Sequence, residues 1–277
     1  MHLSAWLVFT DLDGTLLDHH SYSWDKATPA IELLRQRSIP WMFNTSKTFS
    51  ELQMISLEME NPWPMIVENG GGIAVPDNDQ CAKVFSGIPN YPADMIQVRD
   101  GFRFYSLGYE RERFLPLLAE LKRDFRFLSY SEMTANKLVT LTGLSIDKAK
   151  QSLDREYTEP CLWLDSDSAF MAFDERLGQL GLQCVRGGRF AHIMGKVDKG
   201  TALKWVVSQI FSGSQAQTIA LGDGENDLSM LNAADIAVVV RSPRHEPPGP
   251  CTAPRCIVSK DIGPAGWAGA IIALLNG

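Results

Sequence analysis

Two carboxylates one residue apart, Asp11 and Asp13, are the first residues of the chain whose types and spacing could do chemistry. They stand in the motif Asp-Leu-Asp-Gly-Thr at 11–15, directly after the short apolar run Trp6–Thr10. Neighbouring carboxylates repel each other unless a cation lies between them. Mg²⁺ suits such a place because it prefers hard oxygen ligands and keeps water molecules that a phosphate oxygen can replace. Alone, the motif would be better explained as a solvated turn, since Asp and Gly are common turn residues.

A second acidic loop, Gly-Asp-Gly-Glu-Asn-Asp at 222–227, also follows an apolar run. Two such loops at the ends of two buried strands are harder to explain as turns. We therefore predict a metal site whose carboxylates are Asp11, Asp13, Asp223 and Asp227. In this site Asp223 completes the metal shell and Asp227 supports it.

A site made only of carboxylates would repel a phosphate ester, so the chain must also supply cations and hydroxyl or N–H donors. Thr45 follows the apolar run at 40–44 and precedes a predicted helix, whose first N–H groups favour anions. Ser46 is the competing candidate for the same role. Lys199 begins another predicted helix, and Lys196 is near enough in sequence to take its place. The usual alternative for such a lysine is a solvated surface position.

In their order along the chain, the two acidic motifs, Thr45 and Lys199 resemble the haloacid dehalogenase-like phosphatases, and the resemblance extends over essentially the whole chain. It implies that Asp11 attacks phosphorus and carries an aspartyl phosphate. It implies that Asp13 protonates the leaving oxygen and then deprotonates the hydrolytic water. Thr45 and Lys199 would hold phosphoryl oxygens, and Mg²⁺ would be the cofactor.

The long insertion between Thr45 and Lys199 is similar to that of the capped members of the family (Cof-like, type IIB cap). Three segments further resemble the mannosyl-3-phosphoglycerate phosphatases: Asn-Thr-Ser-Lys-Thr at 44–48, Arg-Glu-Tyr-Thr-Glu-Pro at 155–160 and Gly-Gly-Arg-Phe at 187–190. Thr158 stands where a serine is expected in those enzymes. The resemblance implies Mg²⁺-dependent hydrolysis of mannosyl-3-phosphoglycerate to mannosylglycerate and phosphate.

Five further residues are candidates for substrate binding. Glycerate carries a carboxylate, and Arg189 beside Gly187 and Gly188 could bind it through two N–H groups. A structural arginine paired with a local acid explains the same residue equally well. Glu68 and Asn69 stand on a glycine-rich turn and could meet sugar hydroxyls, although Asn also stabilises such a turn by itself.

Other functions share parts of this pattern. A related capped phosphatase would act on glucosyl-3-phosphoglycerate, sucrose phosphate, a hexose phosphate or a nucleotide. A phosphomutase would use the same aspartyl phosphate but return the phosphoryl group to a sugar. A phospho-accepting signalling domain also gathers acids at strand ends, but the large insertion and the second acidic loop disfavour it. A non-catalytic Mg²⁺-binding module is disfavoured because a nucleophile and a general acid are both present.

The segments around these residues alternate between strand-like and helix-like patterns. Apolar runs predict strands at 6–10, 40–44, 65–67, 218–221 and 236–240. Helices are predicted at 26–37, 48–59, 198–211, 226–233 and 266–275, with Thr48 and Glu51 as a capping box. The alternation predicts an α/β fold, a Rossmann-like parallel-sheet core with helices on both faces. Ligands bind such sheets beyond the carboxyl ends of the strands, where both acidic loops stand.

The middle of the chain has a different pattern of strands and helices, and we predict that it is an inserted α+β cap. Strand patterns occur at 102–107, 161–164 and 182–186, and helical patterns at 111–124, 145–154 and 166–179. The predicted division gives a catalytic core at 1–83 and 195–277 and a cap at 84–194 that selects the substrate. The proline-rich stretch at 242–254 is predicted to be a surface loop.

Length and composition fit an ordinary globular protein. The chain has 277 residues, of which 45% are hydrophobic, and a net charge of −7. The negative charge disfavours nucleic acid as a partner, and no apolar run approaches the roughly 20 residues of a membrane span. Five scattered cysteines indicate free thiols in a reducing compartment, and no N-terminal signal fits, so a cytoplasmic location is predicted. The expected partner is a small phosphate ester, and the expected state is a monomer or a homodimer.

Overall fold

Two β-sheets organise the computed structural model, which describes residues 6–84, 91, 96–186, 189–210 and 216–277. The larger sheet has nine strands in the order β13-β12-β11-β1-β2-β3-β4-β6-β5, and the smaller has four in the order β7-β8-β10-β9. The strands of the larger sheet are β1 (Trp6–Thr10), β2 (Trp41–Asn44), β3 (Met65–Val67), β4 (Gly72–Pro76), β5 (Gln97–Arg99), β6 (Phe102–Ser106), β11 (Gln217–Gly222), β12 (Ile236–Arg241) and β13 (Arg255–Ile262). Those of the smaller sheet are β7 (Phe127–Ser129), β8 (Thr158–Trp163), β9 (Leu182–Arg186) and β10 (Ala191–Gly195).

The order of the strands determines where a ligand can bind. From β13 to β3 the neighbouring strands of the larger sheet pair in parallel, and β4, β6 and β5 continue it in antiparallel pairing. The chain moves outward from β1 to β2 on one side and returns through β11 on the other. Ligands bind α/β sheets at such a switch point. Asp11 and Asp223 directly follow β1 and β11, so the topology brings the two acidic loops together.

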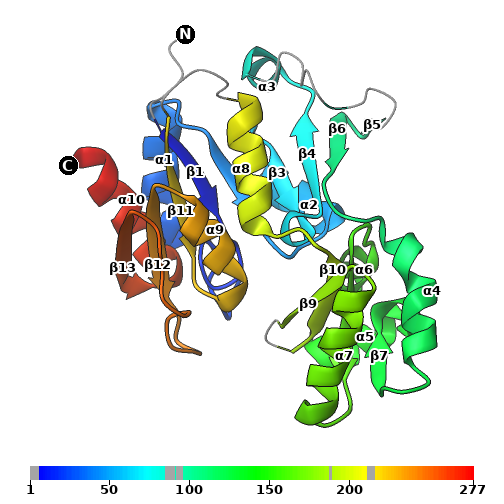
Figure 1. The fold of residues 1–277 in the computed structure, drawn as a ribbon. Helices are drawn as coiled ribbons and strands as arrows, with labels where there is room; N and C mark the ends of the chain where they lie inside the picture. Colours follow the sequence, from blue (N-terminus) through cyan, green and yellow to red (C-terminus); the bar gives the residue numbers. More distant parts are fainter. Residues whose placement is uncertain (1–5, 85–90, 92–95, 187–188, 211–215) are drawn as a thin grey trace.

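Helices cover both faces of the parallel part of the sheet. On one face α1 (Thr28–Gln36) packs beside α10 (Gly263–Asn276), and on the other α8 (Lys199–Ile210) packs beside α9 (Leu228–Ala233), as Figure 1 shows. The strands between them are almost continuously buried and apolar, as expected where both faces of a sheet are covered. α2 (Phe49–Glu58) begins with the predicted capping box, in which Thr48 and Glu51 each bond the other's backbone N–H. The predicted α/β fold with a parallel-sheet core is confirmed.

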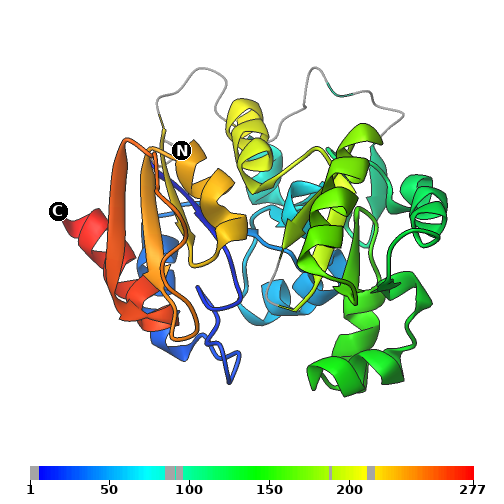
Figure 2. The ribbon, with the colours of Figure 1, turned by 60° about the horizontal axis from the view of Figure 1, so that its bottom comes forward.

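The smaller sheet forms a second unit with its own apolar core. Its helices are α4 (Arg111–Leu121), α5 (Ala135–Thr142), α6 (Ile146–Leu153) and α7 (Asp167–Gln179). Phe114, Phe127 and Phe173 are fully buried in this second core. Figures 1 and 2 show the green to yellow-green cap beside the part of the larger sheet that contains β4 and β6, while β12, β13 and α10 lie on the opposite side.

One predicted cap strand lies in the other sheet. The strand near 102–107 was expected in the cap, but β6 pairs with β4 and with β5 in the larger sheet. The rings of Phe102 and Phe104 lie 5.0 and 4.7 Å from Phe49 of α2. The alternating pattern identifies a strand with one face on a core, but it does not tell which core. β5 and β6 therefore belong to the larger sheet, and α4, whose Phe114 is buried in the second core, comes before the first strand of the smaller sheet. The bounds of the cap stay a prediction.

Several elements have no counterpart in the sequence prediction. These are β4, β5, β7, β10, β13, α5 and α3 (Asp79–Val84). The predicted loop at 242–254 is present, but it is followed directly by the edge strand β13, whose side chains are mostly exposed. Within the described ranges, no helix has the length and apolar character needed to cross a membrane.

Candidate active site

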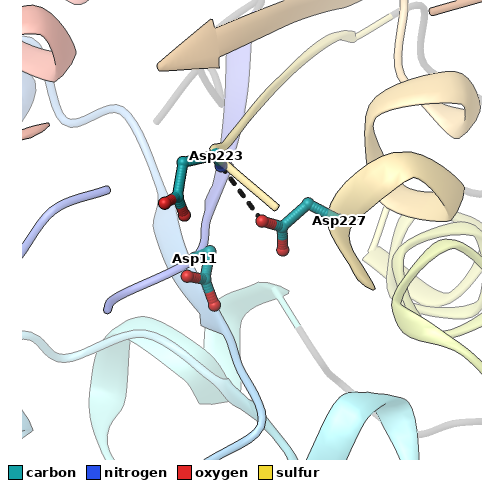
Figure 3. Close-up of side chains that lie close together, drawn as sticks. All are labelled: Asp11, Asp223 and Asp227. Atoms are coloured by element: carbon teal, nitrogen blue, oxygen red, sulfur yellow. Dashed lines mark hydrogen bonds between the residues drawn. The ribbon is translucent and has the colours of Figure 1, made fainter. Parts of the chain in front are cut away.

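Three buried carboxylates converge where β1 and β11 end, as Figure 3 shows. One oxygen from each of Asp11, Asp223 and Asp227 lies within 4.8 Å of the other two. None of the three residues is more than 5% exposed. The turn after Asp11 permits this approach because Gly14 has a φ of +83°, and a Cβ there would lie 2.5 Å from Asp223 Oδ2.

Lys199 is the buried cation of this group. Its Nζ atom lies 2.6 Å from Asp11 Oδ1 and 2.6 Å from Asp227 Oδ1, and its side chain is 0% exposed. The second oxygen of Asp227 accepts hydrogen bonds from the backbone N–H groups of Asp223 (3.0 Å) and Gly224 (2.9 Å). Asp227 therefore holds both the lysine and the acidic loop. Lys196 is exposed, so the structure brings Lys199 to the carboxylates.

The carboxylates carry more negative charge than Lys199 balances. Burial raises the pKa of Asp11 to about 7, with Lys199 opposing the rise and the charges of Asp227 and Asp13 adding to it. Burial and then the charge of Asp11 raise the pKa of Asp223 to about 6, and burial also raises that of Asp227. Carboxylate oxygens that lie this close together, with negative charge that is not fully balanced, fit a small divalent cation. The residues present therefore fit Mg²⁺.

Asp13, predicted as a further metal ligand, does not join this group. Its Oδ2 atom lies 2.8 Å from Lys47 Nζ, so this carboxylate is paired with a lysine instead. Its Oδ1 atom is buried and has no hydrogen-bond partner among the described residues. The structure therefore places Asp13 beside Lys47 and outside the group of three acids, and its role as a metal ligand stays a prediction.

The two candidate phosphate-binding residues of the loop after β2 lie differently. Thr45 is fully buried, and its hydroxyl accepts a hydrogen bond of 3.4 Å from the backbone N–H of Lys47. Ser46 lines the cleft in front of the carboxylates. Thr45 thus supports the loop, and Ser46 contributes to the wall of the cleft. The choice between Thr45 and Ser46 as the phosphate-binding residue stays a prediction.

Glu68, predicted to meet sugar hydroxyls, is corrected by the structure. It is 1% exposed, and its two oxygens accept hydrogen bonds from the backbone N–H groups of Glu156, Tyr157 and Thr158 and from the Thr158 hydroxyl, at 2.7 to 3.2 Å. With both oxygens occupied, it joins the larger sheet to residues 156–158 at the start of β8. Asn69 does line the cleft, and its Oδ1 atom is buried without a partner among the residues described.

A cleft of about 1010 Å³ lies between the acidic loops and the smaller sheet. Arg189 and His192 line it from the smaller sheet's side, together with Arg186 and Phe190. Arg189 makes no ion pair with any described residue, whereas Arg186 pairs with Asp167 at 3.3 Å. The predicted substrate residues Gly187 and Gly188 lie outside the described residues.

Three side chains at the site were not predicted as functional. Thr15 Oγ1 donates to Asp223 Oδ1 at 3.0 Å, and His245 Nε2 lies 3.2 Å from Asp223 Oδ2. Lys47 pairs with Asp13. Thr15 belongs to the acidic motif at 11–15 and Lys47 to the segment 44–48, so their places in these motifs could have indicated a role at the site. His245 stands in the loop at 242–254, where no local pattern marks it.

Comparison with known proteins identifies the family. The sequence profile of the haloacid dehalogenase-like hydrolases matches residues 8–90 and 165–246, more than half of the chain. This chain belongs to the haloacid dehalogenase-like hydrolases. Its two acidic motifs directly follow β1 and β11 of the parallel sheet, as predicted from the sequence.

Two curated relatives of this hydrolase are similar over nearly their full lengths. Both are named glucosyl-3-phosphoglycerate/mannosyl-3-phosphoglycerate phosphatase. The protein of Methanococcoides burtonii is 34% identical, and that of Persephonella marina is 31% identical. Each alignment covers 98% of this chain and 97% of the relative. The family and these relatives make the chain a phosphoric monoester hydrolase.

A solved structure supports the fold of this hydrolase independently of close sequence similarity. The crystal structure of a Thermoplasma acidophilum protein matches with a TM-score of 0.69 at 13% identity, covering 99% of both chains. Since the match covers both chains almost completely, the larger and the smaller sheet together form a known arrangement.

Proposed function

We propose that this hydrolase is a Mg²⁺-dependent phosphatase that converts mannosyl-3-phosphoglycerate to mannosylglycerate and phosphate through an aspartyl phosphate on Asp11. The observation that carries the proposal is the buried group of Asp11, Asp223 and Asp227 around Lys199. The names of the two relatives support the substrate class. Both names also include the glucosyl substrate, so glucosyl-3-phosphoglycerate is the first alternative.

Each residue of the group has a role in phosphoryl transfer. Asp11 is the nucleophile, and Lys199 beside it holds a phosphoryl oxygen as the ester enters. Asp13 protonates the leaving oxygen and later takes a proton from the water that hydrolyses the aspartyl phosphate. Asp11 and Asp223 would hold Mg²⁺, which would supply positive charge for the transferring group. Asp227 fixes Lys199 and the backbone of the acidic loop.

The cleft can hold the rest of the substrate. Its volume of about 1010 Å³ is at the upper end of the roughly 300–1,000 Å³ typical of small-molecule sites. Asn69 Oδ1 and His192 Nδ1 are buried in its wall and have no hydrogen-bond partner in the part of the chain that the structure describes, so a sugar hydroxyl would satisfy them. Arg189 has no carboxylate partner within the described ranges and is proposed to receive the glycerate carboxylate.

A phosphate-release assay tests the proposal. Mannosyl-3-phosphoglycerate should be hydrolysed with the highest kcat/KM, followed by glucosyl-3-phosphoglycerate, and far ahead of sucrose phosphate or a hexose phosphate. Chelator should abolish the activity, Mg²⁺ should restore it, and Ca²⁺ should restore little because it takes more ligands at longer distances. An isomerised sugar phosphate without free phosphate would mark a mutase instead, and full activity in excess chelator would refute the metal role.

A further inference from the structure

Lys47 is a largely buried cation to which the proposed mechanism gives no task. Its Nζ atom lies 2.8 Å from Asp13 Oδ2 and 3.9 Å from Glu51 Oε1, and its side chain is 12% exposed. Its backbone is fixed as well, because its N–H donates to Thr45 Oγ1 and its carbonyl accepts from the N–H of Glu68 at 2.9 Å. A lysine held at so many points has little freedom to move with a substrate.

The position of Lys47 distinguishes it from a phosphate-binding lysine. The cleft wall includes Asp13 and Ser46, whereas Lys47 is not part of that wall within the described segments of the chain. Lys199 already stands between two carboxylates where the phosphoryl group would lie. The shorter of the two ion pairs that Lys47 makes is with Asp13, the proposed proton donor.

The pairing with Lys47 leaves the two oxygens of Asp13 in different surroundings. Oδ2 is held by the ammonium group, while Oδ1 is buried and receives no hydrogen bond from any residue that the structure describes. A buried carboxylate oxygen without a partner is costly unless a ligand supplies one. Oδ1 is therefore the oxygen left without a partner by the described residues, and Asp13 itself lines the cleft in which a leaving group or water would lie.

We propose that Lys47 is the positioning residue of the general acid–base, holding Asp13 Oδ2 so that Oδ1 carries the transferred proton; this rests on the proposed phosphatase function. In the first step Asp11 forms a bond to phosphorus, the P–O bond to the alcohol breaks, and the proton on Asp13 Oδ1 passes to the departing oxygen. Lys47 stabilises the carboxylate that remains. In the second step that carboxylate takes a proton from water as the water attacks the aspartyl phosphate, which returns Asp13 to its starting state.

Leaving groups of different basicity test this role. An alkoxide must be protonated as it leaves, whereas p-nitrophenolate leaves without a proton, so loss of general-acid positioning hurts the two esters unequally. Lys47→Met should lower kcat/KM for mannosyl-3-phosphoglycerate by roughly 30- to 100-fold and for p-nitrophenyl phosphate by less than about 5-fold. We choose kcat/KM because both esters give the same phosphoenzyme, so its hydrolysis does not enter the comparison.

Three further variants make the test specific. Lys47→Arg should restore most of the loss, because a guanidinium group can also pair with Oδ2. Asp13→Asn should show the same preference for the aryl ester, and adding Lys47→Met to it should cost little more. Lys148→Met is the matched control: this exposed lysine approaches the Tyr22 ring at 5.2 Å, as Lys47 does at 5.6 Å, and its loss should leave the ratio of the two esters unchanged.

The outcomes separate this inference from the proposed function. If the wild-type enzyme releases phosphate from neither ester, the phosphatase proposal fails. If it hydrolyses both and Lys47→Met lowers the two kcat/KM values equally, the positioning role is overturned and Lys47 binds phosphate or supports the loop. Lys47→Gln is assayed in parallel, with circular dichroism melts of both variants, so that the result does not depend on the folding of one substitution.

Discussion

Two regions of the molecule bury carboxylates and treat them in opposite ways. At the joint with the smaller sheet, Glu68 has both oxygens occupied by N–H and hydroxyl donors of the segment 156–158. At the active site, Asp11 and Asp223 are buried next to each other, and burial and repulsion raise their pKa values. Donors compensate the cost of removing a charge from water, whereas a second carboxylate increases it. The hydrogen-bonded Glu68 stabilises the fold, whereas the crowded Asp11 and Asp223 favour the binding of a cation.

The joint also affects the backbone around it. Glu68 and Asn69 have φ values of +49° and +58°, which ordinary side chains adopt rarely and at a cost. Arg155, 4% exposed and 3.8 Å from Glu68, donates to the carbonyl of Ser46 at 3.2 Å. The joint therefore holds the loop that carries Ser46 and Lys47. Removing a charge should have opposite consequences in the two regions.

Asp11→Asn should cause the largest loss of activity. An amide cannot form the phosphoenzyme, and removing a nucleophile commonly costs more than ~10³-fold in kcat. The melting temperature in chelator should not fall, because the substitution removes one of the crowded negative charges and leaves Lys199 paired with Asp227. Phosphate release and differential scanning fluorimetry measure the two effects. Turnover like that of the wild type would contradict the role of Asp11 as nucleophile. A strongly lowered melting temperature would contradict the expected difference from Glu68.

Glu68→Gln should show the reverse pattern, with the main loss in stability. The new NH₂ group would face backbone N–H donors, leaving buried donors without an acceptor. We expect the free energy of unfolding to fall by about 2–4 kcal/mol in urea titrations. Glu58→Gln, an exposed change on α2, should alter it by less than ~0.5 kcal/mol. Equal free energies of unfolding for the two variants would show that the hydrogen bonds of Glu68 do not stabilise the fold.

The sequence was sufficient to predict that Asp11 and Asp223 lie close together, because the signals for their positions are local. Asp11 and Asp223 directly follow apolar runs, and parallel strands bring their carboxyl ends to one edge. The role of Glu68 was not predictable, since its partners lie 88 to 90 residues away. His245 comes from an irregular loop without a periodic pattern. The membership of β6 in the larger sheet was not predictable either, because its pairing with β4 and its packing on Phe49 are not indicated by the pattern within 102–106.

The same contrast between satisfied and unsatisfied groups applies to two arginines of the cleft. Arg186 pairs with Asp167 and stacks on Phe170, whereas Arg189 has no ion pair with the described residues. Arg189→Ala should lower kcat/KM for mannosyl-3-phosphoglycerate about 30-fold or more, because a bidentate contact in a cleft is worth about 2–5 kcal/mol. It should change p-nitrophenyl phosphate hydrolysis little, and Arg189→Lys should rescue poorly. Arg186→Ala is the control, and equal losses in both arginine variants would remove the carboxylate assignment.

The smallest effect concerns His192, whose Nδ1 atom is buried and has no hydrogen-bond partner in the described segments. Burial, and then the charges of Arg155 and Lys199, lower its pKa to about 3 from an ordinary value of 6.5. The unfolded chain therefore binds a proton more readily than the folded one below pH 6.5. The stability that this histidine contributes is present above that pH and is lost as the pH falls toward 3.

Urea unfolding of the wild type and of His192→Asn at pH 7.5 and 5.0 isolates this contribution from the titration of the carboxylates. Because the ring lines the cleft and is only partly covered, we expect less than the full shift. The wild type should lose on the order of 1 kcal/mol more than the variant between the two pH values. Equal losses of unfolding free energy would show that His192 is protonated in the folded protein as easily as in water. They would also contradict the proposal that its Nδ1 atom binds a sugar hydroxyl.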